Sequence, residues 1–198
     1  MELINTRFPE VKILVPSRYA DERGFFSEIY NHRTFAQAEI RLDFVQDNHS
    51  YSAKSGTVRG LHFQTPPYAQ DKLVRVARGA IFDVIVDLRH GSPTFGEHMS
   101  LSLAAKEWEQ VLIPAGFAHG LCTLEQGTEV VYKATNYYSP VHDKGIRWCD
   151  PALGIEWPVS PEKAIVSPRD RALPFLRSLP QYFTYAGETE RREEAFPA

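Results

Sequence analysis

The stretch RGLHFQTPPYAQDKLVRVARG, residues 59–79, contains two strand-like segments that are joined by a proline-rich loop. Val74 and Val76 alternate with more polar residues, as a strand with one buried face requires. The same stretch also carries His62 and Lys72, and lysine is seldom fully buried without a partner. We therefore expect a β structure in which these two side chains have a role other than packing.

Short strand-like segments, rich in β-branched and aromatic residues, recur along most of the chain. Turn residues separate them at intervals of about 8–12 positions, a spacing typical of β sandwiches and barrels. Further strands are expected at 11–15, 24–30, 80–88, 98–104, 109–114, 128–138 and 145–148, with a polar turn at 16–23. Helical patterns are confined to 33–40 and 167–179, where Ser167 is a candidate N-cap and Pro174 limits the helix. The sequence thus predicts an all-β protein with a few short peripheral helices.

Length and composition indicate one globular domain. A chain of 198 residues, 43% of them hydrophobic and 24% charged, can bury a core without disulfides or a structural metal. We expect a single domain over residues 1–185 and a mobile charged tail over 186–198, which has few large apolar residues. The formal net charge of −3 argues against general binding of nucleic acid or of an anionic membrane.

Cysteine usage and the N-terminal segment favour a cytoplasmic location. Cys122 and Cys149 lie far apart without metal-binding spacing, so a zinc site is not expected. The pair could form one disulfide or remain as two free thiols, of which free thiols suit a cytosolic protein. The segment MELINTRFPEVKIL, residues 1–14, lacks the apolar core of a signal peptide, and no apolar run approaches the length of a membrane span.

Two histidines lie in sequence surroundings that suggest function, His62 in RGLHFQ and His119 in IPAGFAHGL. The Pro-x-Gly-x-x-His pattern around His119 resembles the second motif of the cupin superfamily, whose fold is a jelly-roll barrel. Metal-binding cupins carry a His-x-His pair in their first motif, but no second histidine stands two residues from His62. Because metal sites usually need three or four protein ligands, a metal-dependent cupin is disfavoured.

Further blocks, in the same order along the chain, resemble the deoxysugar epimerases typified by dTDP-4-dehydrorhamnose 3,5-epimerase. They are FVQDNHSYS, RGLHFQ, QDKLVRVARGAIFDVIVDLR, PAGFAHGL, VVYKATNYYSP, and GIRWCDP followed by GIEWP. The resemblance runs from about residue 3 to about residue 183. It implies a cupin-type jelly roll and an isomerase that needs neither cofactor nor metal and acts on dTDP-4-dehydro-6-deoxy-D-glucose. It also implies a homodimer whose N-terminal segments cross to the partner.

The reaction of this family explains the catalytic residue types. A ketone at C4 of the sugar acidifies the protons at C3 and C5, so inversion needs a base, an acid on the opposite face and a group that stabilises the enolate. By resemblance, His62 is the base, Asp170 orients it, Tyr132 is the proton donor and Lys72 lies near the C4 oxygen. An imidazole is largely neutral at neutral pH, and a phenol can protonate a strongly basic carbanion.

The resemblance also assigns a set of residues to nucleotide or sugar binding. They are Arg23, Glu28, Gln46, Asp47, Asn48, Arg59, Lys72, His119, Tyr138, Asp143 and Arg169. Arginines suit a diphosphate because their donors are planar and bidentate, and Tyr138 matches the aromatic residue that stacks on thymine. Asp143 stands where glutamate is frequent in the family and Arg169 where lysine is frequent, so both contacts change in reach. Because the resemblance implies N-terminal segments that cross, Arg23 and Glu28 could serve either subunit's site.

Simpler alternatives exist for most of these assignments. Lys72 could precede its strand and face solvent, Tyr132 could be a core tyrosine, and Asp170 could serve only as the N3 carboxylate of a helix cap. Strand alternation leaves the direction of His62 open, and Arg75 receives no role. For the whole protein, a single-site 3- or 5-epimerase and a non-catalytic nucleotide-sugar-binding cupin remain open.

Overall fold

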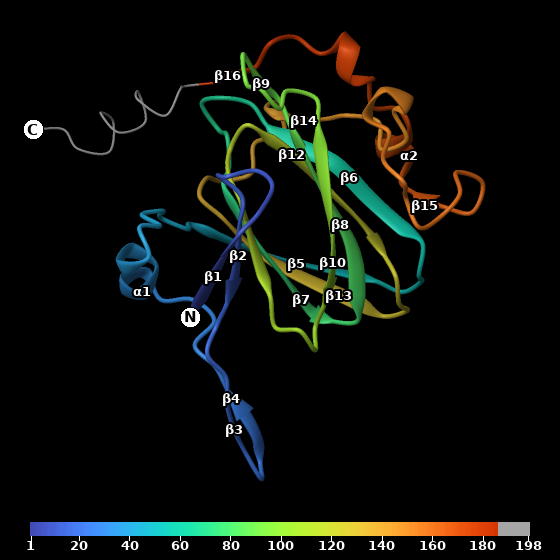
Figure 1. The fold of residues 1–198 in the computed structure, drawn as a ribbon. Coiled ribbons are helices and arrows are strands. Elements are labelled where there is room, and N and C mark those ends of the chain that lie inside the picture. Colours follow the sequence, from blue (N-terminus) through green and yellow to red (C-terminus); the bar gives the residue numbers. More distant parts are fainter. Residues whose placement is uncertain (186–198) are drawn as a thin grey trace, which may run out of the picture.

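The computed structural model describes residues 1–185, which form two facing β-sheets in a jelly-roll arrangement (Figure 1). The first sheet has the strand order β1 (Glu2–Asn5), β2 (Lys12–Val15), β11 (Gln110–Ile113), β7 (Lys72–Arg78), β13 (Thr128–Ala134), β5 (Gln46–Ser52). The second has the order β10 (His98–Ala104), β8 (Ala80–Asp87), β12 (Phe117–Thr123), β6 (Thr57–Gln64), β14 (Asp143–Gly145), with β15 (Ile165–Val166) parallel to β6. The predicted all-β class is confirmed, while the predicted tail at 186–198 lies outside the described residues.

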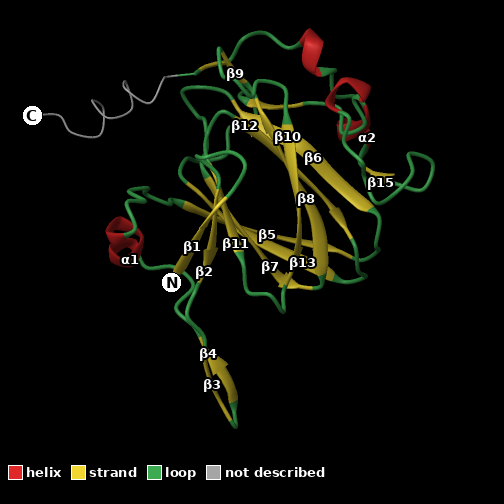
Figure 2. Cartoon of the chain, viewed as in Figure 1, coloured by secondary structure: helices red, strands yellow, loops and turns green. Residues whose placement is uncertain are grey.

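Smaller elements surround the two sheets (Figure 2). Strands β3 (Tyr19–Asp21) and β4 (Gly24–Phe26) form a hairpin that projects from the barrel, and β9 (Arg89–His90) pairs with β16 (Phe183–Thr184). The helices are α1 (His32–Gln37), η1 (Pro151–Leu153), α2 (Pro168–Arg171) and η2 (Leu176–Ser178). These helices are short and peripheral, as the sequence predicts.

An apolar core fills one end of the space between the sheets. Val74 of β7, Ile85 of β8 and Val111 of β11 are fully buried in one cluster. On the opposite face of the first sheet, Phe35 of α1 packs with Leu112. Burying a side chain of this size stabilises the fold by about 1.5–3 kcal/mol. The core therefore fixes the parts of the same strands that carry polar side chains toward the space between the sheets.

The sequence-based prediction misses strands β1, β5, β9, β15 and β16, and it differs from the structure at two further places. The strand predicted at 24–30 ends at Phe26, and its partner β3 lies within 16–23, because Asp21 accepts a hydrogen bond from the backbone N–H of Arg23 (2.9 Å) and closes a hairpin. Strand β12 lies between the strands predicted at 109–114 and 128–138 and was not itself predicted. Closely spaced glycines and His119 interrupt the alternation of apolar and polar residues there.

Several element boundaries also differ, and α1 spans His32–Gln37 instead of the predicted 33–40. Helix α2 ends at Arg171, well before the predicted end at residue 179, and Pro174 lies three residues beyond it. The predicted cap is confirmed, since Ser167 accepts a hydrogen bond from the backbone N–H of Asp170 (3.0 Å). Strand β13 ends at Ala134 instead of residue 138, and the strand predicted at 145–148 lies instead at Asp143–Gly145.

Two glycines allow β6 and β12 to approach each other closely. Gly60 has a φ of +121°, and a Cβ atom built on it would lie 2.5 Å from the Cα of Gly120. The pairing register shifts between His119 and Leu121, and His119 lies directly opposite His62. This irregularity explains why simple alternation cannot decide the direction of His62, and it brings both histidines to one place.

Both cysteines are free, Cys122 in the core and Cys149 at the surface. Burial raises the pKa of the Cys122 thiol to about 11, so this thiol stays protonated. Within residues 1–185, no helix is long and apolar enough to cross a membrane.

Candidate active site

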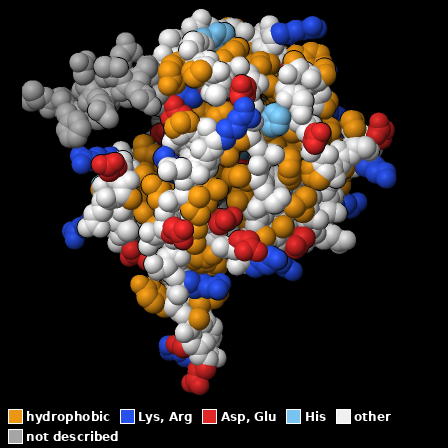
Figure 3. All heavy atoms as spheres, in the orientation of Figure 1, with side chains coloured by type: hydrophobic (Ala, Val, Ile, Leu, Met, Phe, Trp, Pro, Cys, Tyr) orange, Lys and Arg blue, Asp and Glu red, His pale blue; other side chains and the backbone are white. Residues whose placement is uncertain are grey.

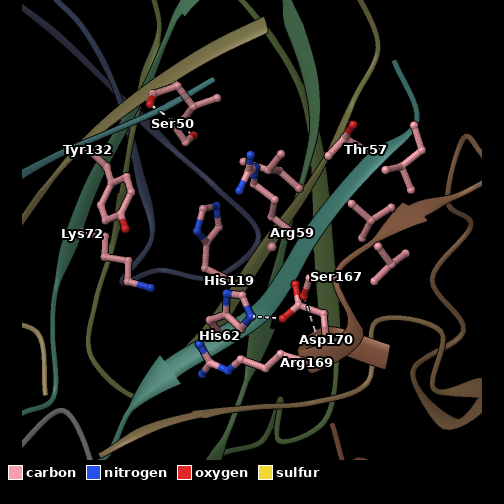
Figure 4. A pocket seen from close by; sticks show the side chains of 16 residues that line it. Ser50, Thr57, Arg59, His62, Lys72, His119, Tyr132, Ser167, Arg169 and Asp170 are labelled. Atoms are coloured by element: carbon pink, nitrogen blue, oxygen red, sulfur yellow. Dashed lines mark hydrogen bonds and ion pairs between the residues drawn. The ribbon is translucent and has the colours of Figure 1, made fainter. Parts of the chain in front are cut away.

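A cavity of about 490 Å³ lies between the two sheets (Figure 4). Side chains from both sheets and from α2 line it. Seven of the residues predicted for the site are among them: Arg59, His62, Lys72, His119, Tyr132, Arg169 and Asp170. The structure thus brings all four predicted catalytic residues into one cavity.

The imidazole of His62 is held by the carboxylate of Asp170. His62 Nε2 lies 2.8 Å from Asp170 Oδ1, and the histidine side chain is 30% exposed while that of the aspartate is 6% exposed. This hydrogen bond favours the tautomer with the proton on Nε2. The other ring nitrogen, Nδ1, has no hydrogen bond to any described residue, so its lone pair is available to a ligand.

Asp170 serves two structural purposes at once. It is the third residue after the cap Ser167, and its Oδ2 also accepts a hydrogen bond from the backbone N–H of Gly60 (3.2 Å). Burial alone would raise the pKa of Asp170, but the hydrogen bond and charge of His62, together with the bonds from Gly60 and Ser167, lower it. The cap and the contact with His62 therefore coexist, and the carboxylate stays ionised beside the histidine.

Lys72 projects into the cavity from the first residue of β7. Its ammonium lies 6.0 Å from the ring centroid of Tyr132 and forms no ion pair with any described residue. Desolvation lowers the pKa of Lys72 to about 8, against an opposing attraction from the carboxylates of Asp143 and Asp83. The inward direction favoured by strand parity is confirmed, and the side chain carries a positive charge at neutral pH.

Tyr132 lies on β13 with its hydroxyl group beside Lys72 (Figure 4). The residue packs against the core cluster but also lines the cavity. Burial, followed by the charge of Asp143, raises the pKa of the Tyr132 phenol above its usual value. The phenol is therefore fully protonated at neutral pH and able to donate that proton.

A second histidine of the cavity, His119, is also paired with an aspartate, which is buried behind it. His119 Nε2 lies 2.7 Å from Oδ1 of Asp83, whose side chain is fully buried. The other oxygen of Asp83 is buried without a hydrogen-bond partner among the described residues. Sequence analysis missed Asp83, although a charged residue between Ile81 and Ile85, at an inward position of an apolar strand, could have indicated it.

Arg169, which lines the cavity, belongs to a cluster of polar residues. The Tyr138 hydroxyl group donates a hydrogen bond to Asp143 Oδ2 (2.9 Å), and Arg169 Nη2 lies 2.6 Å from the same oxygen. The hydrogen bond to Asp143 raises the pKa of Tyr138. The tyrosine ring is 54% exposed. Asp143 and Arg169, the two contacts expected from the sequence to change in reach, thus pair with each other.

The lining residue Arg59 and two further predicted residues, Gln46 and Asn48, lie on strands β6 and β5. Arg59 donates from Nε to the Ser52 hydroxyl (3.2 Å) and from Nη2 to the Tyr51 carbonyl oxygen (3.0 Å). Gln46 Nε2 donates to Asn48 Oδ1 (2.8 Å), which leaves the buried Nδ2 of Asn48 without a partner in the described chain. That amide is free to donate a hydrogen bond to a ligand.

Three predicted residues lie away from this chain's own cavity. Asp47 faces outward from β5, where it accepts hydrogen bonds from Lys133 Nζ (2.8 and 3.1 Å). Arg23 is on the projecting hairpin and pairs with Asp21, while Glu28 accepts a hydrogen bond from Asn31 (3.0 Å). A simple Arg23–Glu28 ion pair is therefore not observed. The assignment of these three residues to binding stays a prediction.

No group of three or more His, Cys, Asp or Glu side chains within residues 1–185 could hold a metal ion. The polar groups that line the cavity are instead the His62–Asp170 pair, the imidazole of His119, an ammonium, a phenol and guanidinium groups. This set combines a base, an acid and cationic groups for an anionic ligand.

The family model that describes dTDP-4-dehydrorhamnose 3,5-epimerase matches residues 5–178. The chain belongs to this family. The Salmonella typhimurium dTDP-4-dehydrorhamnose 3,5-epimerase is 52% identical over 179 residues, covering 89% of this chain and 96% of that enzyme. The predicted family, the enzyme class of isomerase and the 3,5-epimerase activity are thereby confirmed.

Solved structures agree with this assignment. The Bacillus anthracis dTDP-4-dehydrorhamnose 3,5-epimerase, with TDP and pyrophosphate bound, is 50% identical with a TM-score of 0.85, covering 88% of this chain and 98% of that one. The Legionella pneumophila dTDP-6-deoxy-D-glucose-3,5-epimerase, in complex with dTDP-4-keto-L-rhamnose, is 41% identical with a TM-score of 0.89, covering 94% and 99%. The cupin-type jelly roll predicted for this epimerase family is confirmed.

Proposed function

We propose that this cavity inverts C3 and C5 of dTDP-4-dehydro-6-deoxy-D-glucose through an enolate, with His62 as the base and Tyr132 as the acid. The observation that carries the proposal is the placement of the two groups. The His62–Asp170 pair comes from β6 and α2, and Tyr132 comes from β13 on the facing sheet (Figure 4). A base and an acid on opposite walls are what inversion at carbon requires.

Proton removal begins at His62. The neutral ring, with Nε2–H donated to Asp170, uses the lone pair of Nδ1 to take the proton from the carbon next to the ketone. The imidazolium that forms is stabilised by the ionised carboxylate of Asp170. The electron pair of the broken C–H bond moves toward the C4 oxygen, which becomes an enolate.

Lys72 and Tyr132 complete the step on the other wall. The ammonium of Lys72 stabilises the charge that develops on the C4 oxygen, and low dielectric strengthens that interaction. The protonated phenol of Tyr132 then delivers its proton to the opposite face of the carbon, which inverts the centre. Solvent returns the proton to the tyrosine and removes the one held by His62.

Isotope exchange tests the base. His62→Ala should abolish exchange of the C3 and C5 protons with deuterium oxide, measured by proton NMR, while normal exchange in that variant would reject His62. The same spectra of the wild-type product separate double from single epimerisation. Deuterium at both C3 and C5 supports the double reaction, and stable labelling at one carbon indicates a single-site epimerase. A protein that binds dTDP but exchanges neither proton would be a non-catalytic binding protein.

We further propose that the active form is a homodimer in the cytoplasm, in which each projecting hairpin reaches the partner's cavity. The hairpin extends away from its own barrel and exposes apolar rings (Figure 3), with Tyr19 67%, Phe25 55% and Phe26 70% exposed. The Arg23 side chain is 84% exposed and distant from its own site's lining. Such a surface suits contact with a second copy.

Mixing two inactive variants tests this arrangement. His62→Ala and Arg23→Ala, each with low activity as a pure protein, are unfolded together at equal concentration and refolded. If Arg23 serves the partner's site, half of the dimers are mixed and each has one intact site, so that about a quarter of wild-type activity returns. Activity that stays at the sum of the two pure variants would contradict the exchange of hairpins.

A further inference from the structure

Gln64, the last residue of β6, is buried at 5% exposure and uses its whole amide group in hydrogen bonds to two loops. Its Nε2 donates to the carbonyl oxygens of Tyr68 (2.7 Å) and Tyr137 (3.1 Å). Its Oε1 accepts from the backbone N–H of Ser139 (2.7 Å). A primary amide has two donor hydrogens, so neither is left over. The bonds to Tyr137 and from Ser139 hold the backbone immediately before and after Tyr138.

A second glutamine holds the residue between them. Gln46 of β5 accepts a hydrogen bond from the backbone N–H of Tyr138 (2.9 Å). The carbonyl of residue 137 and the N–H groups of residues 138 and 139 are therefore held by two side chains that come from opposite sheets. The Tyr138 side chain is more than half exposed, and its hydroxyl donates a hydrogen bond to Asp143.

We propose that Gln64 is a positioning residue for nucleotide recognition, because it fixes the backbone on both sides of Tyr138 and so orients the ring against the base. The inference rests on the proposed role of Tyr138 as the platform that stacks on the base. Stacking depends on the direction of the ring, and a loop that is already held in the binding conformation does not have to be ordered when the ligand arrives. No contact of Gln64 with the reacting sugar is required.

A purely structural role predicts a different outcome. A buried glutamine could simply satisfy loop carbonyls, since buried polar groups need partners wherever they occur. In that case its loss would lower the melting temperature and affect kcat and affinity through general loosening. If Gln64 has a positioning role, it acts on nucleotide binding only through the ring of Tyr138. Its effect on nucleotide affinity should therefore disappear when that ring is removed.

A double-mutant cycle separates the two roles. Gln64→Glu keeps the shape and the acceptor for Ser139 but replaces both donors with an oxygen that faces two carbonyls. Calorimetry with dTDP compares wild type, Gln64→Glu, Tyr138→Ala and the double variant. Loss of a stacking platform weakens binding by about tenfold or more, and we expect Gln64→Glu to lose about tenfold in the wild-type background. In the Tyr138→Ala background it should lose less than about twofold.

Kinetics give the second readout. For Gln64→Glu, KM should rise about tenfold while kcat changes less than about threefold, since the His62–Asp170 pair is untouched. Gln70→Glu is the matched control, because Gln70 Nε2 donates to the carbonyl oxygen of Asn136 (2.7 Å) in the same loop without contacting the peptides beside Tyr138. Its dTDP affinity should change less than about twofold.

Several results would overturn the inference. They are an unchanged dTDP affinity in Gln64→Glu, equal losses in both backgrounds, and a loss in Gln70→Glu as large as that in Gln64→Glu. If Gln64→Glu fails to fold, Gln64→Met removes all three hydrogen bonds without adding charge and enters the same cycle. A wild-type protein that does not bind dTDP at all would instead refute the proposed nucleotide site, and the inference with it.

Discussion

The two walls of the cavity differ in the chemistry they hold. The wall built by β6 and α2 carries an imidazole that is paired with a carboxylate and keeps one ring nitrogen free. The facing wall, built by β7 and β13, carries Lys72 and Tyr132, an ammonium with a lowered pKa and a phenol with a raised pKa. One wall is thus equipped to take a proton and the other to stabilise a negative charge and give a proton back.

The difference shows how a β sandwich can support inversion. Each sheet contributes inward positions on alternate residues, so a polar residue placed at one end of a strand faces the opposite sheet across the cavity. The apolar part of the same strands, such as Val74 and Ile85, keeps the sheets at a fixed separation. The separation of the base and the acid therefore follows from the packing of the core.

Removing the carboxylate of Asp170, which supports the base His62, should lower kcat strongly. Asp170→Asn removes the carboxylate that fixes the tautomer of His62 and stabilises the imidazolium, so kcat should fall by about 10²–10⁴. Asp150→Asn is the matched control, because Asp150 is also a buried helix cap, accepting from Ala152 N–H (3.0 Å) and Leu176 N–H (2.7 Å). We expect that control to lower the melting temperature but not kcat. Equal kcat values for the two variants would contradict the role of Asp170.

Removing the positive charge of Lys72 from the facing wall should lower kcat by a smaller but clear amount. Lys72→Met keeps the length of the side chain while losing the charge that stabilises the enolate oxygen, so kcat should fall by about 10²–10³. Lys106→Met, at an 83% exposed position, should retain full activity. Steady-state kinetics of both variants measure the difference. A Lys72→Met variant that lost only substrate affinity would show that Lys72 binds the ground state and the transition state equally.

The charge of Lys72 also predicts a pH dependence. Lysine is charged below its pKa, and here the pKa is about 8, so the stabilising charge is lost as the pH rises through that value. The kcat should therefore fall above pH 8 by up to about tenfold per pH unit. Lys72→Arg, whose guanidinium stays charged, should lack this fall even if its overall activity is lower. A wild-type profile that stays flat to pH 10 would contradict the assignment.

The sequence predicts much of this arrangement, but not all of it. The alternation around Val74 indicates the sheet and the inward direction of Lys72, and the Ser167 cap predicts the start of α2. The direction of His62 could not be obtained in this way, because the positive φ of Gly60 and the register shift beside it interrupt the alternation. The contact of His62 with Asp170 joins residues 108 positions apart, a proximity that only the resemblance to the family could suggest.

Other parts of the site depend on tertiary contacts that a local pattern does not contain. Asp83 is visible in the sequence as a charge in an apolar strand, but only the fold places it against His119. The bonds from Gln64 join the end of β6 to the loop around Tyr138, two segments that no local pattern connects. Arg23 was assigned by resemblance alone, and its own chain does not bring it to the cavity.

The most direct test of the two-wall account is the Tyr132→Phe variant in deuterium oxide, followed by proton NMR. This variant keeps the base but loses the acid, so His62 should still remove protons and return solvent deuterium to the same face. The account predicts that recovered substrate carries deuterium without inversion, while His62→Ala shows neither exchange nor inversion. Inverted product formed by Tyr132→Phe at the wild-type rate would contradict the account, and so would the absence of any exchange in that variant.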